Sequence, residues 1–275
     1  MITDVTNEHK ETWCWINGAF STVDRASIPV SDSGFLLGQG LFETVRSERG
    51  MLIGWDRHWD RLQQGLGVVS WPVRPFDGRE LEDVAVELVS RNELEIGAKV
   101  RLTVSPESFV MTAETPPSYA ASLRVALGSR IRNACGYTRG LKTTSYLENV
   151  LALAEARDKG VDELLLLNER GELSEGACSN VFAFVEGQWR TPPLSSGCLP
   201  GITRGILLEL GTTEAVLRKE ELSRAEAMVF TSSLKGVLPV RQWEDSCFDP
   251  EQVRVAELQD AYRKWIGQRY FRERR

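Results

Sequence analysis

Residues 141–182 read LKTTSYLENVLALAEARDKGVDELLLLNERGELSEGACSNVF. A helix is expected near Glu148 to Lys159, followed by a strand at Glu163 to Leu167, and this order is typical of α/β proteins. Lys142 precedes the helix, and Glu175 lies in the GELSEG turn after the strand. Taken alone, each is most simply a solvated surface charge.

The chain upstream of this stretch also mixes strand and helix patterns. An Asn17-Gly18 pair is a typical hairpin turn, and apolar residues at helical spacing predict helices. The expected elements are strands at Trp13 to Ala19, Leu41 to Arg46 (before a Glu48-Arg49-Gly50 turn) and Val100 to Val104, and helices at His58 to Leu66 and Leu81 to Leu94.

A linker is expected at Thr112 to Ser122, because the Pro116-Pro117 pair inside it interrupts both helices and central strands. The predicted domains are a smaller N-terminal α/β domain, 1–117, and a larger C-terminal domain, 118–275. Downstream we expect a strand at Leu123 to Leu127, a hairpin around Glu186-Gly187, a helix after Gly201 and a long helix within Val253 to Gln268.

The composition indicates a folded protein that acts on small molecules. The chain has 275 residues, of which 42% are hydrophobic and 26% charged, and its net charge is -6. An acidic protein is poorly suited to bind nucleic acid or an anionic membrane, since both need clustered Lys and Arg. The polar N-terminus, residues 1–10, has no signal-peptide pattern, so a cytoplasmic location is expected.

Several kinds of catalytic site have no support in the sequence. There are two histidines, and neither a G-x-S-x-G motif nor H-E-x-x-H is present, which disfavours a serine hydrolase and a catalytic zinc. Five cysteines without a C-x-x-C pair favour reduced thiols and no metal. The glycines of GFLLGQG (34–40) match no nucleotide-binding loop.

Four segments together supply the groups that pyridoxal phosphate (PLP) requires. Lys142 offers an amine for the cofactor's aldehyde, Glu175 a carboxylate for its ring nitrogen, and Arg61 in RHWDRL a guanidinium for its phosphate. The expected helix that begins at Gly201-Ile202-Thr203-Arg204 would add free N–H groups, which also favour a phosphate.

The sequence resembles the class IV, branched-chain-type PLP aminotransferases and their lyase relatives. The segments that carry the resemblance span about 210 residues in the family's order: SDSGFLLGQGLFETVR (31–46), RHWDRL (57–62), 141–182 as quoted above, TPPLSSGCLPGITR (191–204) and FTSSLKGVLPV (230–240). The resemblance implies the fold-type IV, D-amino-acid aminotransferase-like fold: two α/β domains (an α+β arrangement overall) with PLP in the cleft between them, usually in a homodimer.

The resemblance also implies roles for individual residues. Lys142 would form the Schiff base with PLP and move protons on the substrate, which is a small molecule with an amino group. Glu175 would bind the pyridinium nitrogen, and Arg61 the phosphate. The remaining phosphate ligands would come from the helix start, Ile202 and Thr203, and from a second loop, Ser232 and Ser233.

Three reactions of this superfamily remain open: those of 4-amino-4-deoxychorismate lyase, D-amino-acid aminotransferase and branched-chain aminotransferase. Phe42 and Ser105 stand where D-specific enzymes typically carry a tyrosine and an arginine. Branched-chain enzymes usually have a longer lysine segment with an asparagine–tyrosine pair five residues on, whereas here Tyr146 lies four residues after Lys142 and no such pair follows. The lyase, which forms 4-aminobenzoate for folate biosynthesis, is therefore the first expectation. A binding module that retains PLP as a relic is a distant alternative. The expected substrate-binding residues are Phe42, Arg101 and Arg46.

Overall fold

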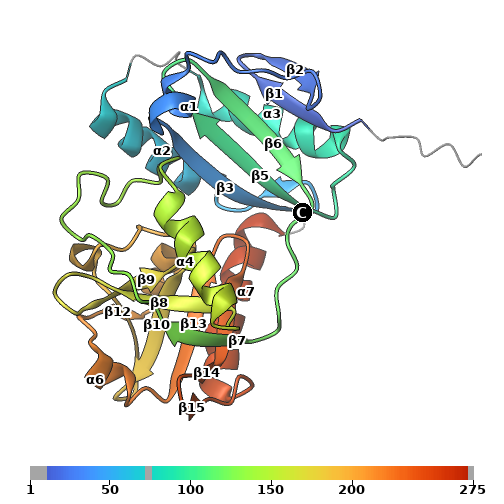
Figure 1. Cartoon of the computed structure of the whole chain (residues 1–275). Helices are drawn as coiled ribbons and strands as arrows, with labels where there is room; N and C mark the ends of the chain where they lie inside the picture. Colours follow the sequence, from blue (N-terminus) through green and yellow to red (C-terminus); the bar gives the residue numbers. More distant parts are fainter. Residues whose placement is uncertain (1–10, 72–75, 272–275) are drawn as a thin grey trace, which may run out of the picture.

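A computed structural model describes residues 11–71 and 76–271, whose strands form two separate sheets (Figure 1). Six strands lie between Trp13 and Glu114, and nine lie between Leu123 and Cys247, counted over the described residues. The short helix α1 (Ser33–Leu37) precedes the third strand. The mixture of helix and sheet agrees with the α/β class expected from the sequence.

The N-terminal sheet is antiparallel throughout, in the order β2-β1-β6-β5-β3-β4. The first hairpin turns at Asn17 and Gly18, whose φ angles of 50° and 104° are those that an Asn-Gly turn supplies. The strands are β1 (Trp13–Ile16), β2 (Ala19–Thr22), β3 (Leu41–Glu48), β4 (Met51–Leu52), β5 (Gly97–Val104) and β6 (Phe109–Glu114).

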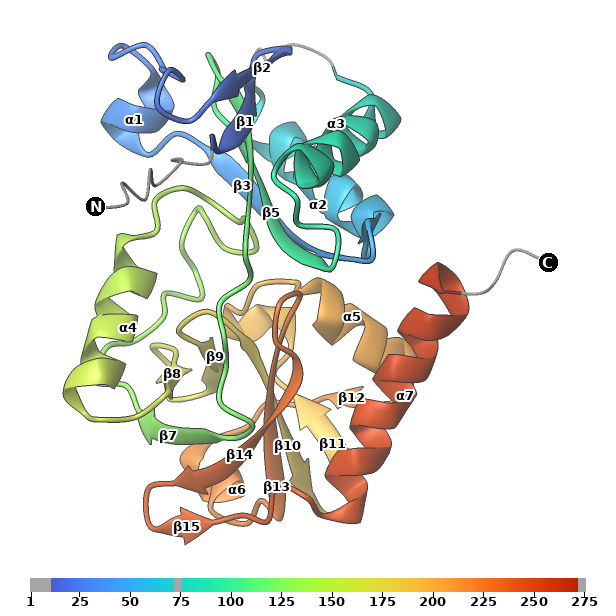
Figure 2. The same cartoon turned by 90° about the vertical axis from the view of Figure 1, so that its right-hand side faces the viewer.

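Helices α2 (Trp55–Val69) and α3 (Gly78–Arg91) pack on one face of this sheet, as Figure 2 shows. The strands alternate, so that Leu41 and Val45 of β3 and Val100 of β5 join the core beneath these helices. The intervening side chains of β3 and β5 point to the opposite face. That face is turned toward the C-terminal half of the chain.

The connection between the two sheets is shorter than the sequence suggests. Thr112 to Glu114 were expected in the linker, but they belong to β6, where they pair with β1 and β5. Long-range pairing of this kind leaves no local signal beside the prolines. The expected boundary at residue 117 falls inside the connection, and the division into domains 1–117 and 118–275 stays a prediction.

The C-terminal sheet is mixed, in the order β12-β11-β10-β13-β14-β7-β8-β9, with β15 paired to β14. Neighbours β14, β7 and β8 run parallel. The strands are β7 (Leu123–Leu127), β8 (Glu163–Leu167), β9 (Leu173–Gly176), β10 (Asn180–Val185), β11 (Gln188–Thr191), β12 (Thr213–Glu214), β13 (Ala227–Ser232), β14 (Gly236–Trp243) and β15 (Ser246–Cys247).

Both faces of the central strands of this sheet are buried. In β10, Val181 and Ala183 enter one cluster, and Phe182 enters another that includes residues of α5 (Ile202–Glu209) and α7 (Val253–Tyr270). Helix α4 (Leu147–Asp158) packs on β8. The chain also forms a short 3-10 helix, Leu194–Ser196, and helix α6 (Lys219–Leu222).

Within the part of the chain that the structure describes, no helix is both long and apolar enough to cross a bilayer. The expectation that no targeting signal is present concerns residues 1–10, which lie outside the described residues. The cytoplasmic location stays a prediction.

Candidate active site

A cavity of about 450 Å³ lies between the two sheets, a size typical of small-molecule sites. The N-terminal sheet contributes the face of β3 and β5 that α2 and α3 leave free. Almost all of the predicted site residues line the cavity, although they come from segments far apart in the sequence: Phe42, Arg61, Arg101, Lys142, Glu175, Ile202, Thr203, Ser232 and Ser233.

Backbone hydrogen bonds to the start of β3 hold the Lys142 segment at the cavity. The Lys142 carbonyl accepts a hydrogen bond from Phe42 N at 2.8 Å, and Thr144 N donates to the Gly40 carbonyl at 2.8 Å. The first residues of β3 therefore fix the lysine segment. This contact also explains Gly40 of GFLLGQG, because a Cβ there would lie 2.5 Å from Thr144 Oγ1.

The amine of Lys142 is well suited to act as a nucleophile. Its Nζ lies 4.3 Å from the centroid of the Phe42 ring, and no hydrogen bond or ion pair joins it to another described residue. Burial, with a contribution from Arg61, lowers the pKa of Lys142 to about 8. Near neutral pH a far larger fraction of this amine is therefore unprotonated than in a solvated lysine.

Glu175 lies on β9 with 7% of its surface exposed. Its Oε1 is 2.8 Å from Arg132 Nη2, and its Oε2 accepts a hydrogen bond from Leu199 N at 2.9 Å. Burial raises the pKa of Glu175, and Arg132 and the Leu199 amide oppose that shift. A carboxyl group in this setting can hold a cationic ring nitrogen.

Arg61 is fixed by a buried acid that the sequence did not single out. Its Nε and Nη2 donate to the two oxygens of Glu43, at 2.8 and 2.6 Å, and its Nη1 donates to the Pro200 carbonyl at 2.8 Å. Arg61 lowers the pKa of Glu43 to about 2 against the effect of burial. The guanidinium has five N–H groups, so two remain for an anion.

His58 extends this arrangement to the second phosphate loop. Its Nδ1 lies 2.7 Å from Glu43 Oε2, and its Nε2 lies 3.1 Å from Ser233 Oγ. Burial lowers the pKa of His58, which favours a neutral ring that donates to Glu43 and accepts from Ser233. His58 thus joins Ser233 of the second predicted phosphate loop to Glu43, the partner of Arg61.

The helix start expected after Gly201 is present as α5. Gly201 is its N-cap, and no side chain caps it, so the first N–H groups of the helix are free to bind an anion. Gly201 is tightly enclosed, because a Cβ there would lie 1.9 Å from Asn180 Oδ1. Ser232, at the end of β13, accepts a hydrogen bond from Lys235 N at 3.1 Å.

The predicted substrate residues differ in their placement. Arg101 lines the cavity, with its guanidinium 3.7 Å from the Phe42 ring centroid. Arg46 lies on the same face of β3 as Phe42 but pairs with Glu48, and it is not among the residues that line the cavity. Ser105 is also outside the lining and donates to Asp32 Oδ2 at 2.9 Å.

Glu43, Arg132 and Tyr146 belong to the site, and the sequence reasoning gave them no role there. Glu43 could have been found from the sequence, because it lies between Leu41 and Val45 on the face of β3 that packs on the core. Tyr146 donates to Cys178 Sγ at 3.1 Å, and burial raises the pKa of its hydroxyl. Arg132 lies in an irregular loop, where local sequence carries no comparable signal.

Comparison with known proteins identifies the family of this chain. The family model for class IV amino-transferases matches residues 40–243. A relative from Methanocaldococcus jannaschii, named a putative branched-chain-amino-acid aminotransferase, is 28% identical over 262 residues, which cover 87% of this chain and 90% of the relative.

Solved structures share the fold at lower identity. The branched-chain amino acid aminotransferase of Thermobaculum terrenum, in its PLP form, has a TM-score of 0.83 and 21% identity, with 95% of this chain and 96% of that chain covered. A putative 4-amino-4-deoxychorismate lyase from Legionella pneumophila has a TM-score of 0.81 and 22% identity, with coverage of 87% and 95%. Because the family model spans most of the sequence, the chain belongs to the class IV aminotransferase family.

Proposed function

We propose that this chain is an aminotransferase that holds PLP through Lys142 and exchanges an amino group between an amino acid and a 2-oxo acid. Membership of the class IV family makes the chain a PLP-dependent enzyme. The observation that carries the proposal is a buried amine with a pKa of about 8 in the same cavity as a carboxyl group and an anion-binding set.

The donor groups of the cavity fit the cofactor. Lys142 would supply the amine for its aldehyde, Glu175 would bind its ring nitrogen, and Arg61 would bind its phosphate with the start of α5 and with Ser232 and Ser233. Because Glu43 neutralises Arg61, the N–H groups of α5 contribute much of the attraction for a dianion. When bound, PLP supplies an electron sink for negative charge on the substrate carbon.

The chain's own groups would carry the proton and orient the substrate. The Lys142 amine would remove a proton from the substrate carbon and would later return one. Arg101 has no carboxylate partner among the described residues, and its Nε contacts Thr103 Oγ1 at 3.1 Å. We assign it to the substrate carboxylate, with Phe42 as the apolar surface beneath it.

The relatives support an aminotransferase better than the lyase that the sequence favoured first. The Methanocaldococcus relative carries an aminotransferase name, and so does the Thermobaculum structure. Ser105 lies outside the cavity. The lack of an arginine at position 105 is therefore weak evidence against a D-amino-acid aminotransferase. Lyase activity is the second candidate, favoured by Phe42 in place of a tyrosine and by the Legionella neighbour.

Substrate tests on the purified holoprotein separate the two reactions. We expect L-leucine, L-isoleucine, D-alanine or D-glutamate to convert the aldehyde form of the cofactor to pyridoxamine phosphate, with loss of its visible absorbance. Aminodeoxychorismate should give no 4-aminobenzoate. The lyase would be established instead if 4-aminobenzoate forms and the cofactor stays in its aldehyde form with each of these amino acids.

A further inference from the structure

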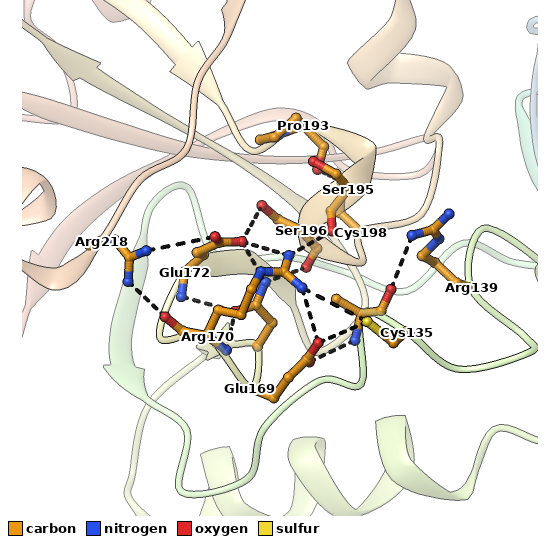
Figure 3. A network of polar contacts seen from close by, with 12 residues as sticks. Cys135, Arg139, Glu169, Arg170, Glu172, Pro193, Ser195, Ser196, Cys198 and Arg218 are labelled. Carbon is orange, nitrogen blue, oxygen red and sulfur yellow. Dashed lines mark hydrogen bonds and ion pairs between the residues drawn. The ribbon is translucent and has the colours of Figure 1, made fainter.

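The turn between β8 and β9 carries a polar network centred on Glu172 (Figure 3). One oxygen of Glu172, Oε2, accepts hydrogen bonds from Asn168 Nδ2 and Arg170 Nη2, both at 2.8 Å, and from Ser196 Oγ at 3.1 Å. Its Oε1 lies 3.7 Å from Arg218 Nη2. Glu172 is 8% exposed and does not line the cavity described above.

This network attaches the segment 194–201 to the turn. Arg170 Nη2 donates to the Ser195 carbonyl at 2.8 Å, and Asn168 Nδ2 lies 3.3 Å from the Ser196 carbonyl. The same segment supplies the Leu199 amide to Glu175 and the Pro200 carbonyl to Arg61. Its backbone therefore connects the Glu172 network directly to the candidate active site.

The turn also holds the other partner of Glu175. Glu169 Oε2 accepts a hydrogen bond from Ala134 N at 2.9 Å, and Arg132 N donates to the Leu167 carbonyl at 2.7 Å. Gly197 closes the gap between the two segments, since a Cβ there would lie 2.8 Å from Ala134 Cα. The segments that carry Arg132 and Leu199 are thus fastened to the β8–β9 connection, residues 167–172.

We propose that Glu172 is a positioning residue, which holds the Leu199 amide and the Arg132 guanidinium on Glu175 from outside the cavity. The inference rests on the proposed role of Glu175. Three donors share one oxygen of Glu172, so the side chain fixes a loop rather than forming an isolated surface pair. Loss of its charge loosens segment 194–201 first, because that segment is bound through Ser195 and Ser196.

The Glu172→Gln variant tests this role, with Glu226→Gln as the matched control. Glu226 makes an ion pair with Arg254, outside the cavity lining. In the holoprotein, we expect Glu172→Gln to speed amide hydrogen exchange in segments 194–201 and 132–135, and Glu226→Gln to leave both unchanged. The dissociation constant for PLP should rise by about tenfold, the effect of one hydrogen bond to a charged group.

A double-mutant cycle separates positioning from general stability. If Glu172 acts through Glu175, its effect on PLP affinity should shrink in a Glu175→Gln background, whereas independent effects would add. Should Glu172→Gln fail to fold, Ser196→Ala removes one of the three hydrogen bonds and should show the same pattern at a smaller size.

Three results would overturn the proposal: unchanged exchange at 194–201 in Glu172→Gln, unchanged PLP affinity in that variant, or fully additive effects in the cycle. Failure of the proposed function is distinguishable from these results. If Glu175→Gln alone leaves the PLP spectrum and affinity unchanged, Glu175 is not the ring partner. If Glu175→Gln has an effect and Glu172→Gln has none, the positioning role alone is wrong.

Discussion

Lys142 illustrates how the environment of one side chain sets its chemistry. Burial lowers its pKa from 10.5 to about 8, so the folded chain releases this proton at lower pH than the unfolded chain. Between these two values the unfolded state binds more protons than the folded state. The apoprotein should therefore gain stability from this residue as the pH rises through that window.

The rate at which the apoprotein captures PLP should follow the same titration. Only the unprotonated amine reacts with the aldehyde, so the rate should rise with pH up to about 8 and then level off. Stopped-flow absorbance at a series of pH values measures this, with Lys142→Met as the unreactive control. A rate that keeps rising toward pH 10.5, the ordinary value, would indicate a solvated lysine.

At this scale the sequence predicted single side chains better than their partners. Lys142, Glu175 and Arg61 could be chosen because each lies in a recognisable motif. Their partners come from other parts of the chain, as Arg132 does for Glu175 and Glu43 does for Arg61. Only the folded structure brings these pairs together. The sequence therefore could not show that Glu43 binds two of the N–H groups of Arg61.

Helix α5 allows a prediction at the scale of one element, because two of its glycines have opposite surroundings. Gly201→Ala should clash with Asn180 and cost about 1–3 kcal/mol of stability, and it should weaken PLP binding by moving the helix start. Gly205→Ala is the matched control. It lies inside the helix, a Cβ added there would have no neighbouring atom within 4 Å, and the substitution should gain about 0.5–1 kcal/mol.

Chemical denaturation of the apoprotein and PLP titration measure both variants. Equal stability of Gly201→Ala and the wild type would show that the helix start has room to adjust.

Elements with a local signal were predicted well from sequence, such as the Asn17-Gly18 hairpin and α7. Strand β6 was missed, because its only distinctive feature is pairing with β1 and β5 across the sheet.

At the scale of the whole molecule, and among the described residues, helices α1 and α4 expose apolar side chains and lie on the same side in Figure 2. A hydrogen bond joins the end of α1 to the segment before α4, as the Ser145 hydroxyl donates to the Gly38 carbonyl at 3.1 Å. We propose that this surface forms the interface of the expected homodimer, since monomers rarely expose large apolar patches. Its exposed residues are Phe35, Leu36, Leu37, Leu147, Val150 and Leu151.

Sedimentation velocity at micromolar concentration should show a dimer for the wild type and a shift toward monomer for Leu37→Glu. Leu37 is 76% exposed. The same substitution at Ile96, which is 94% exposed in a turn beyond α3, should leave the dimer intact. A monomeric wild type, or equal effects of the two variants, would be inconsistent with this interface.

The central claim about the whole molecule is that Lys142 holds PLP in the cavity between the two sheets. Borohydride reduction of the holoprotein fixes the cofactor to the amine that carries it, and peptide mass spectrometry then identifies the residue. We predict loss of the visible absorbance and a phosphopyridoxyl group on the peptide that contains Lys142. A modified Lys159 or Lys235 with Lys142 unmodified, or no bound cofactor, would contradict the account.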